Sequence, residues 1–414
     1  MPGSRQANRA IASLIAMRIV YAINWLNVGA VFYAMGPEFG SGVVGLGTLT
    51  STFYLGLGLF QLPGGVMAAK WGPKKIVVLG TMLSSASALA TGIAPTLEVV
   101  AVLRLLVGAG MAFVFAPAVV IISGLVRGGG SGVGVGLFNS AYDVGGIFAL
   151  FLWGIIAATT GWRPSLELGG GLGIVSGLLV MLTAPVDEKK LEFKVRTEQL
   201  RKVLEDPRLI IIAVGMLAVS VGNGLISSFM EYYLIGTFGV GTAYAGIIAS
   251  MVVAIPIFSA LYAGRLYDRT RRTKALMLAS NVGGIAALAV SAYPSVVTAL
   301  ACTLVGGLIS GFGFTVGFAA AKDYHRAERE YDGLAVAWVN CISLTGAVFP
   351  PIIFSYVADL NGYPYAWLAG ALLTAIFTVP LLFLAEKGGG ARAALQLSRR
   401  PSLRPQSAQT HLSP

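Results

Sequence analysis

The chain has 414 residues, of which 56% are hydrophobic and 11% charged, with a mean hydropathy of +0.78 and a net charge of +11. A soluble globular domain carries roughly twice that share of charged residues, about 25%, so the composition excludes one. Two cysteines and two histidines offer no metal-ligand cluster, and we expect no metal site and no cofactor.

Twelve apolar blocks follow one another along the chain, each about 20 residues or longer. This length is needed to cross a hydrocarbon core of about 30 Å. The first block is too long for a cleavable signal and is followed by further blocks, so we interpret it as an uncleaved first helix. The sequence predicts membrane-spanning helices at 10–35, 44–68, 75–94, 97–126, 131–158, 165–184, 208–236, 241–264, 274–293, 297–321, 333–357 and 364–385.

Polar segments divide these blocks into two groups of six. We expect an N-terminal six-helix bundle at 1–185 and a C-terminal six-helix bundle at 208–386. A cytoplasmic linker at 186–207, with a surface helix, should join them. The tail at 387–414 is rich in Gly, Ser, Pro and Arg, and we expect it to be cytoplasmic and disordered. The predicted fold class is therefore an all-α polytopic membrane protein.

Basic residues indicate the orientation of the chain. With the N-terminus inside, 26 of the 29 Lys and Arg residues fall in cytoplasmic segments, and Arg163 alone falls in an external loop. This bias follows the positive-inside rule, and an odd number of spans would destroy it. We expect a multi-pass protein of the cell (plasma) membrane with both termini cytoplasmic. Its positive charge then faces the anionic inner leaflet of the bilayer and not a nucleic acid.

The two halves of the chain repeat each other at offsets of 199 to 201 residues. Halves related in this way enclose a cavity at their interface, where transporters bind their solute. The matched pairs are Asn24 with Asn223, Gly40 with Gly239, Gly65 with Gly264, Lys70 with Arg269, Asn139 with Asn340, and Gly161 with Gly362.

The loops after the second and eighth spans carry a recognisable motif. Residues 264–272 (GRLYDRTRR) resemble the Gly-x-Leu-x-Asp-Arg-x-x-Arg-Arg signature of the major facilitator superfamily, one residue shorter at its end. The first-half copy has Ala69 where the family has an acid. Arg104, Gly108 and Gly110 are similar to the family's Arg-x-x-x-Gly-x-Gly pattern in helix 4. The resemblance extends over almost the whole chain and implies two pseudo-symmetric six-helix bundles.

The resemblance also implies a gating function for these loops. In the family the loop acid is thought to pair with the partner half and to steady the outward-facing state. Asp268 fits this function as a carboxylate near a helix N-terminus. The alternative is a positive-inside anchor with an incidental acid, but gating is the favoured interpretation at Asp268 because the family spacing fits. The anchor is the favoured interpretation at Lys70, because the acid is missing at Ala69. The gating-loop candidates are Gly65, Lys70, Gly264, Asp268 and Arg269.

Four ionisable residues lie within the predicted spans, where each costs ~2.5–3.5 kcal/mol on insertion scales. Arg104 and Asp143 lie at similar depths, about 10–12 Å from the outer face, on neighbouring antiparallel helices. An ion pair between them is feasible, either as a structural bridge or as an anion-binding arginine with a proton-exchanging acid. The other two ionisable residues are Arg18 and Glu231.

Arg18 and Glu231 each allow two interpretations. Arg18 either snorkels to the cytoplasmic surface or contacts the solute, because it shares a helix face with Tyr21 and Asn24. Glu231 is followed by two tyrosines near the outer end of its span. It is either part of an interface-level aromatic anchor or a protonatable gate residue.

Four asparagines in repeat-equivalent places complete the candidate set, together with Tyr142 beside Asp143. Unpaired amides are costly in lipid-facing positions. We therefore expect them to point inward, either bonding between helices or reaching the central cavity. They are Asn24, Asn139, Asn223 and Asn340.

These features favour a secondary active or facilitative transporter that moves a small solute by alternating access, functional as a monomer. Two intramembrane arginines suit an organic anion or polar metabolite, with protons as a coupling ion through Asp143 or Glu231. One alternative is proton-coupled efflux of hydrophobic or cationic compounds, although the fifth span lacks the Gly-Pro signature of that branch. Another is a membrane receptor or sensor without transport. Isolated charges on different helices give no reason to expect an enzyme.

Overall fold

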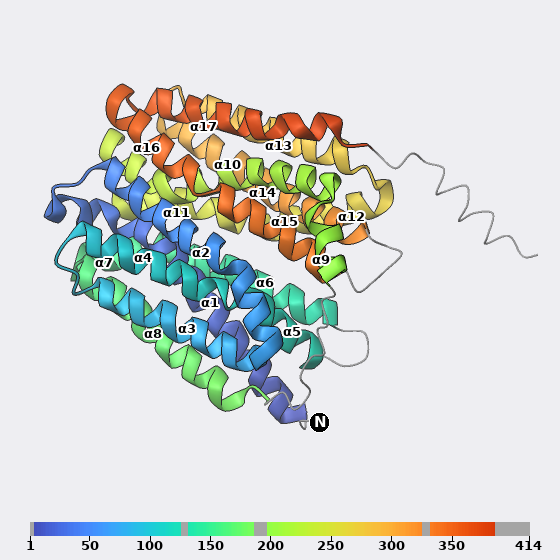
Figure 1. Cartoon of the computed structure of the whole chain (residues 1–414). Helices are drawn as coiled ribbons and strands as arrows, with labels where there is room; N and C mark the ends of the chain where they lie inside the picture. The colour runs from blue at the N-terminus through green and yellow to red at the C-terminus, as the bar shows by residue number, and fades with distance from the viewer. Residues whose placement is uncertain (1–3, 126–130, 186–196, 325–331, 386–414) are drawn as a thin grey trace, which may run out of the picture. The chain divides into compact units, whose positions relative to one another are not determined.

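The computed structural model describes residues 4–125, 131–185, 197–324 and 332–385. These residues are almost entirely helical and contain no β-strand. Residues up to Leu384 form one compact unit, in which long helices lie side by side (Figure 1). The expected disordered tail at 387–414 lies outside the described residues.

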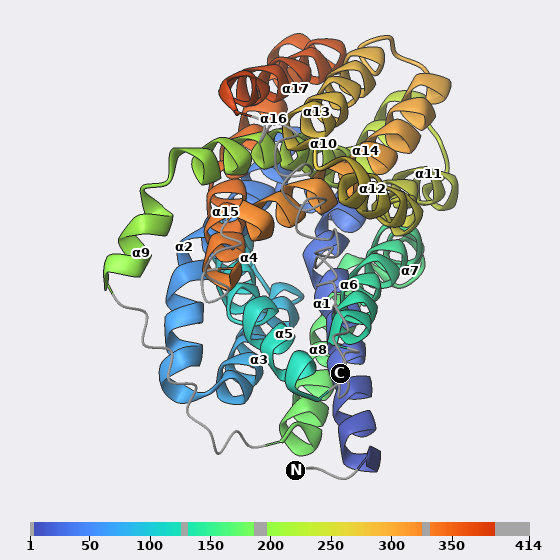
Figure 2. The same cartoon turned by 90° about the vertical axis from the view of Figure 1, so that its right-hand side faces the viewer.

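The first half of the chain folds into eight helices and two short turns of helix. The strongest packing is that of α2 on α4, of α3 on α8, and of α1 on α6 and α8. Figures 1 and 2 show these segments, coloured blue to green, gathered together. They are α1 (Ser4–Met35), η1 (Gly36–Phe39), α2 (Val43–Trp71), α3 (Pro73–Thr91), α4 (Leu97–Ala112), α5 (Phe115–Leu125), α6 (Ser131–Ile147), η2 (Phe148–Leu152), α7 (Trp153–Thr160) and α8 (Trp162–Thr183).

The second half has a corresponding set, in which α13 packs on α14 and α17, and α10 on α14, α15 and α17. Its first helix, α9, falls within the predicted linker and confirms a helix there. The segments are α9 (Thr197–Leu204), α10 (Pro207–Phe238), α11 (Thr242–Ala254), α12 (Pro256–Thr270), α13 (Thr273–Val290), α14 (Val296–Tyr324), α15 (Asp332–Gly346), α16 (Phe349–Asn361), α17 (Tyr363–Thr378) and η4 (Val379–Phe383).

Within the described ranges, eleven helical stretches are long and apolar enough to cross a membrane. They correspond to eleven of the twelve predicted spans. The twelfth prediction, 75–94, corresponds to α3, which is helical over 19 residues. Its hydropathy is lowered by Lys74 and Lys75 at one end and by three serines near the other. Because α3 packs lengthwise on α4 and α8, it takes the place of the third span.

Several spans are interrupted where the sequence predicts continuous helices. The eighth span divides into α11 and α12 at Pro256, and the eleventh divides into α15 and α16 just before Pro350. Proline lacks the N–H that an uninterrupted helix needs. The fifth span contains the π-helical turn η2 between α6 and α7, a feature that often marks functional positions. Spans five and eleven are repeat-equivalent, so the interruption occurs in both halves.

The backbone itself repeats between the halves. Gly40 and Gly239 have φ angles of 60° and 62°, and Gly161 and Gly362 have φ angles of 96° and 89°. Glycine adopts such positive φ values with little strain. These are matched pairs of the sequence repeat, which the backbone geometry therefore confirms.

Two lysines provide a second repeat-equivalent feature. Nζ of Lys74 donates to the carbonyl of Ala184, and Nζ of Lys274 donates to the carbonyl of Leu382, each at 2.5 Å. Each lysine thus caps the C-terminal end of the last span in its own half, where a helix favours a cation.

Small residues let the two halves approach closely. A Cβ atom at Gly29 of α1 would lie 3.0 Å from the Ser228 carbonyl of α10. A Cβ at Gly246 of α11 would lie 2.6 Å from the Leu150 carbonyl of η2. Backbones that come this close need glycine at the contact. Both contacts lie near the outer ends of their helices, so the halves meet closely on the outer side.

The outer loops of the first half are joined by one charged cluster. Glu38 accepts hydrogen bonds from Nε1 of Trp162 at 2.7 Å and from Nη2 of Arg163 at 2.6 Å. Arg163 also donates to the carbonyls of Gly92 and Ala94. The one basic residue predicted outside is therefore paired, and it connects three external loops.

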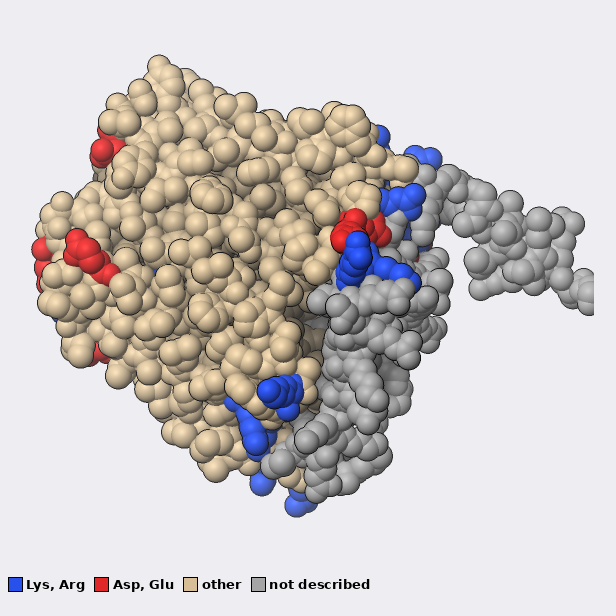
Figure 3. Space-filling view, in the orientation of Figure 1, with Lys and Arg blue, Asp and Glu red and all other residues tan. Residues whose placement is uncertain are grey.

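Charged side chains lie at the two ends of the molecule. On the face drawn in Figure 3, acidic groups lie at one end and basic groups, with some acidic ones beside them, lie at the other, with a broad uncharged surface between them. Such a belt is what the hydrocarbon region of a bilayer requires.

Candidate functional site

Arg18 on α1 lies in a cage of aromatic rings. Its guanidinium carbon is 4.4 Å from the ring centre of Tyr21, 4.7 Å from Tyr142, 4.9 Å from Phe115 and 5.1 Å from Phe138. The rings come from α1, α5 and α6, and they attract the cation through their electron-rich faces. The residue is only 7% exposed. The interpretation that it snorkels to the cytoplasmic surface is therefore wrong.

The guanidinium group retains unused hydrogen-bond donors. Nε and Nη1 of Arg18 are buried, and no group in the described part of the chain accepts from them. Buried polar groups are nearly always paired, and leaving one unpaired costs about 1–3 kcal/mol, more if it is charged. These donors suit the two oxygens of a carboxylate or a similar oxyanion.

The aromatic cluster extends from Arg18 to the interface between the halves. The ring of Trp25 lies 5.8 Å from Tyr21, 5.6 Å from Tyr142 and 6.1 Å from Tyr54. The Tyr54 hydroxyl reaches α10, where it would lie 3.2 Å from a Cβ atom at Gly224. The site therefore connects α1, α2 and α6 of the first half with α10 of the second.

Asp143 is the acid of this site. It is half-buried, one residue after Tyr142, and near enough to Arg18 for their charges to interact. The two side chains form no direct ion pair among the described residues. A carboxylate whose charge interacts with Arg18 can compete with a bound anion for that arginine.

Arg104 has a different environment from the one predicted. Its Nη1 donates to the carbonyl of Asn24 at 2.9 Å, and its Nη2 donates to the carbonyl of Trp25 at 3.0 Å. The feasible ion pair with Asp143 is not formed among the described residues, because Arg104 donates to the backbone of α1, and the charge that acts on Asp143 is that of Arg18. Arg104 thus joins α4 to α1 behind the aromatic cluster.

Glu231 is buried between helices and does not face the lipid interface. It is 2% exposed, and its Oε1 lies against Gly154 of α7. The interpretation as an interface-level anchor is therefore wrong. The gate interpretation is untested and remains a prediction.

Asn24 differs in its bonding from Asn139 and Asn340. Asn24 donates to the carbonyl of Gly169 at 2.9 Å and so bonds α1 to α8. Asn139 is exposed and Asn340 half-buried, and within the described residues neither side chain makes a hydrogen bond. Helix-to-helix bonding is thus observed at Asn24, whereas Asn139 and Asn340 stay candidates for the cavity.

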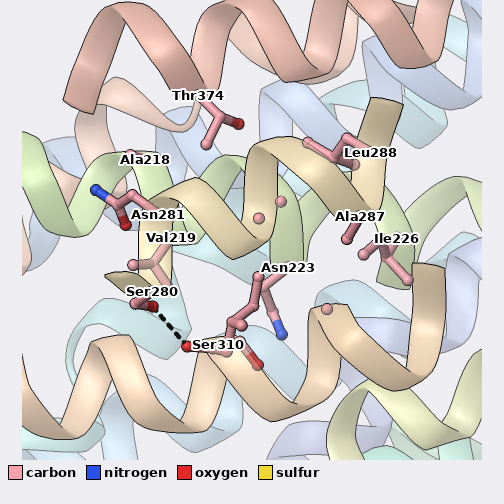
Figure 4. A pocket seen from close by; sticks show the side chains of 14 residues that line it. Ala218, Val219, Asn223, Ile226, Ser280, Asn281, Ala287, Leu288, Ser310 and Thr374 are labelled. Carbon is pink, nitrogen blue, oxygen red and sulfur yellow. Dashed lines mark hydrogen bonds between the residues drawn. The ribbon is translucent and has the colours of Figure 1, made fainter. Parts of the chain in front are cut away.

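Asn24 and Asn223 also line two repeat-equivalent pockets, one inside each half. The pocket around Asn223 is bordered by Ser280, Asn281 and Ser310 (Figure 4), and Ser280 donates to the Ile309 carbonyl at 2.9 Å. The cavity volume of each pocket is about 10 Å³, which is room for no more than about one water molecule. Ligand pockets usually hold ~300–1,000 Å³. The pocket around Asn24 is also lined by Tyr21, so it adjoins the aromatic cage of Arg18, whereas the pocket around Asn223 lies in the other half.

A model of the Major Facilitator Superfamily matches residues 14–321 and 212–410. The chain belongs to the major facilitator superfamily. Its twelve-helix fold, predicted from the repeat and the apolar blocks, is the fold of that family.

Curated superfamily relatives are similar to this chain at low identity. An uncharacterized MFS-type transporter of Bacillus subtilis (strain 168), YybF, is 23% identical over 274 residues, which are 65% of this chain and 66% of the relative. A probable nitrate transporter of Staphylococcus aureus (strain bovine RF122 / ET3-1), NarT, is 24% identical over 260 residues, 61% of this chain and 66% of the relative. The match thus spans just under two thirds of each relative's length.

Solved structures of the superfamily share the fold. A bacterial homolog of the human lysosomal transporter Spinster, inward-facing and unoccupied, has a TM-score of 0.74 at 18% identity, covering 93% of this chain and 96% of that one. A D-xylose–proton symporter has a TM-score of 0.72 at 14% identity, covering 94% and 99%. At such identities the likeness concerns the fold alone.

The superfamily loop after α12 differs from its predicted geometry. Asp268 lies in the last turn of α12, so the favourable N-terminal dipole expected for it is wrong. Its Oδ1 pairs with Nη2 of Arg271 at 3.1 Å, and Arg271 also pairs with Asp323 of α14. These bonds stay within the second half. A pairing of Asp268 with the partner half remains a prediction for another conformation.

The other loop candidates lie at the ends of α2 and α12 that are predicted to be cytoplasmic. Gly65, Lys70 and Arg269 are exposed, and Gly264 is half-buried. A Cβ atom at Gly65 would meet nothing within 4 Å, so this glycine is not required by close packing in the conformation described.

Sequence reasoning missed two of the four rings of the aromatic cage. Phe115 and Phe138 contact Arg18 from α5 and α6, and neither was a candidate. The available signal was the spacing of Tyr21 and Trp25, which lie three and seven residues after Arg18 on one helix face. Within the described residues no group of three His, Cys, Asp or Glu side chains could hold a metal ion.

Proposed function

We propose that the protein is a secondary transporter that carries a small organic anion across the cell membrane by alternating access. Two bundles, 1–185 and 208–386, rock about the Arg18 cluster, joined by the linker at 186–207. Both termini, with the tail at 387–414, lie in the cytoplasm, and the monomer is the working unit.

The buried, unsatisfied guanidinium of Arg18 carries this proposal. Its rings stabilise the cation, while its Nε and Nη1 donors are buried and have no acceptor among the described residues. An oxyanion supplies the missing acceptors and the missing negative charge. The relatives named as probable nitrate transporters support an anionic solute, although the substrate here is proposed only as a chemical class.

The aromatic cluster around Arg18 contacts the second half of the chain. This contact supports a coupling between solute binding and the movement of the two bundles. Tyr54 touches α10 at Gly224, so a solute that orders the aromatic rings also changes the contact between the bundles. Binding energy that differs between two conformations shifts the balance between them.

Protons are the proposed coupling ion, acting at Asp143. The Asp143 carboxylate interacts with Arg18 and competes there with an anionic solute. A proton on Asp143 removes that competition, so proton and anion bind together. The symporter among the structural neighbours is consistent with this.

Efflux of cationic compounds is the second candidate and is less well supported. The aromatic rings and Asp143 would suit an organic cation. However, the charge at the centre of the cage is Arg18, which is cationic itself. A receptor without transport has no specific observation in its favour.

Flux into proteoliposomes tests the proposal. Purified protein would be offered radiolabelled monocarboxylates, dicarboxylates, nitrate and a cationic dye, with and without an inward proton gradient. We expect saturable uptake of one anion class, stimulated by the gradient. Arg18→Gln should weaken its apparent affinity by at least about 100-fold, since two charged hydrogen bonds are lost.

Arg9→Gln is the matched control, because Arg9 is an exposed arginine of the same helix and its loss should leave uptake unchanged. Flux of the cationic dye that depends on Asp143 and persists in Arg18→Gln would overturn the anion proposal.

A further inference from the structure

Glu231 is a buried acid that takes no part in the proposed anion site. It lies on α10, seven residues before the helix ends at Phe238, or about 10 Å from the outer end at 1.5 Å per residue. Both of its carboxylate oxygens are buried, with no hydrogen-bond partner in the described residues.

The carboxyl group lies across the interface between the halves. Its Oε1 contacts Gly154 of α7 so closely that a side chain there would collide with it. The methyl group of Thr242 on α11 and the carbonyl of Ala30 on α1 approach the same point. Two helices from each half therefore enclose this one group.

No charged residue compensates the carboxylate. Residues 27–35 of α1, all of α7 and all of α11 contain no Lys, Arg, His, Asp or Glu. The titratable groups on the outer parts of these helices and beside Glu231 are all tyrosines: Tyr33, Tyr244, Tyr232 and Tyr233.

An isolated carboxylate is far costlier to bury than a neutral carboxylic acid. In the conformation described the outer parts of the halves are in contact, so the neutral form is the one that this interface accommodates. When the halves part, water reaches the group and the ionised form becomes accessible. Closing the interface therefore takes up a proton, and opening it releases one.

We propose that Glu231 is a proton-binding site that latches the outer gate. The proton comes from the external medium, adds to one carboxylate oxygen as the gate closes, and returns to that medium as the gate opens. Acid outside therefore favours the outer-closed conformation. The proposal rests on the alternating-access motion proposed above but not on the identity of the solute or on Asp143.

Spin labels across the outer gate test this directly. Glu98→Cys and Tyr293→Cys place labels at exposed outer positions of the two halves, in a Cys302→Ser/Cys341→Ser background. Double electron–electron resonance on the full-length protein in nanodiscs, without solute, would measure the distance as pH is varied between about pH 5 and pH 8. We expect the ratio of short to long distances to fall as pH rises, by up to about tenfold per unit, the limit for one proton.

Glu231→Gln, which keeps the shape of the acid without ionising, should hold the short distance at every pH. Asp359→Asn, at an exposed outer acid, should keep the wild-type response. The proposal is overturned if Glu231→Gln still responds to pH, or if Asp143→Asn alone removes the response. It is also overturned if sodium in place of choline closes the gate at alkaline pH, which would indicate a metal cation as ligand. A distance that never changes would contradict the alternating-access motion itself.

Discussion

Two arginines buried in neighbouring helices show how differently the same residue can be used within one bundle. Arg104 donates two hydrogen bonds, one to the backbone carbonyl of Asn24 and one to that of Trp25. Arg18 has its charge surrounded by rings and its Nε and Nη1 unused. Both are intramembrane cations in the sequence, and only their partners distinguish a helix clamp from a binding group.

Arg104→Lys tests the clamp. A lysine ammonium is compact, strongly hydrated and unable to form the fork of a guanidinium, so it cannot reach both carbonyls. We expect a loss of roughly 2–3 kcal/mol of stability, the value of about one charged hydrogen bond. Thermal unfolding of the detergent-solubilised protein measures it, with Arg9→Lys as the exposed control. Unchanged stability together with lost anion binding would instead make Arg104 a solute ligand.

The paired depths of Arg104 and Asp143 were predictable, whereas their partners were not. Counting residues from the ends of a span gives depth along the membrane normal. It does not give the direction in which a side chain points around the helix, which depends on how the helices rotate and pack. For this reason the sequence placed these two residues at one level but could not show that Arg104 bonds to the backbone of α1 and that the charge of Arg18 acts on Asp143.

At the scale of helices, close glycine contacts hold the outer side of the two bundles together. Gly29 lies against α10, and Gly246 lies against the π-helical turn η2. The repeat predicted which spans correspond, and the backbone confirms it at Gly40 and Gly239. The interruptions in the spans were not predicted, because a hydropathy pattern is the same for a straight helix and for one that contains a π-turn.

Gly246→Ala should prevent tight closure of the outer gate. Its Cβ would lie 2.6 Å from the Leu150 carbonyl, a backbone atom that cannot rotate away. We expect a cysteine at Ala30, which is buried in this conformation, to react several-fold faster with an external maleimide in this background. Gly236→Ala is the control, because its Cβ would meet only Tyr33, at 3.9 Å. Equal labelling in both backgrounds would show that η2 yields to the added methyl group.

At the scale of the whole molecule, the separation of charge defines the orientation in the membrane. On the face drawn in Figure 3, acidic groups gather at one end and basic groups, with some acidic ones beside them, at the other, as the distribution of Lys and Arg along the sequence predicts. Arg163 is the external exception, and its pairing with Glu38 accounts for it. The arrangement of the spans in the membrane was therefore more predictable than the site. It depends on the total charge and hydropathy of whole segments, whereas the site depends on the contacts of single side chains.

Cysteine labelling in intact cells tests this orientation. The native Cys302 and Cys341 are both buried and should stay unreactive. A membrane-impermeant maleimide should label Glu98→Cys and leave Lys75→Cys unlabelled until the cells are permeabilised. Both positions are exposed, so accessibility alone does not separate them. The reverse pattern would place the N-terminus outside.

The central claim is that the caged guanidinium of Arg18 binds the anion that the protein carries. Its most direct test is uptake of the best anionic solute by proteoliposomes containing wild type, Arg18→Lys, Arg18→Gln or Arg9→Gln, each at equal amounts of folded protein. Arg18→Lys keeps the charge without the planar fork and should retain part of the uptake with a raised KM. Arg18→Gln should lose at least about 100-fold in apparent affinity, and Arg9→Gln should match wild type. Uptake by Arg18→Gln equal to wild type would contradict the account.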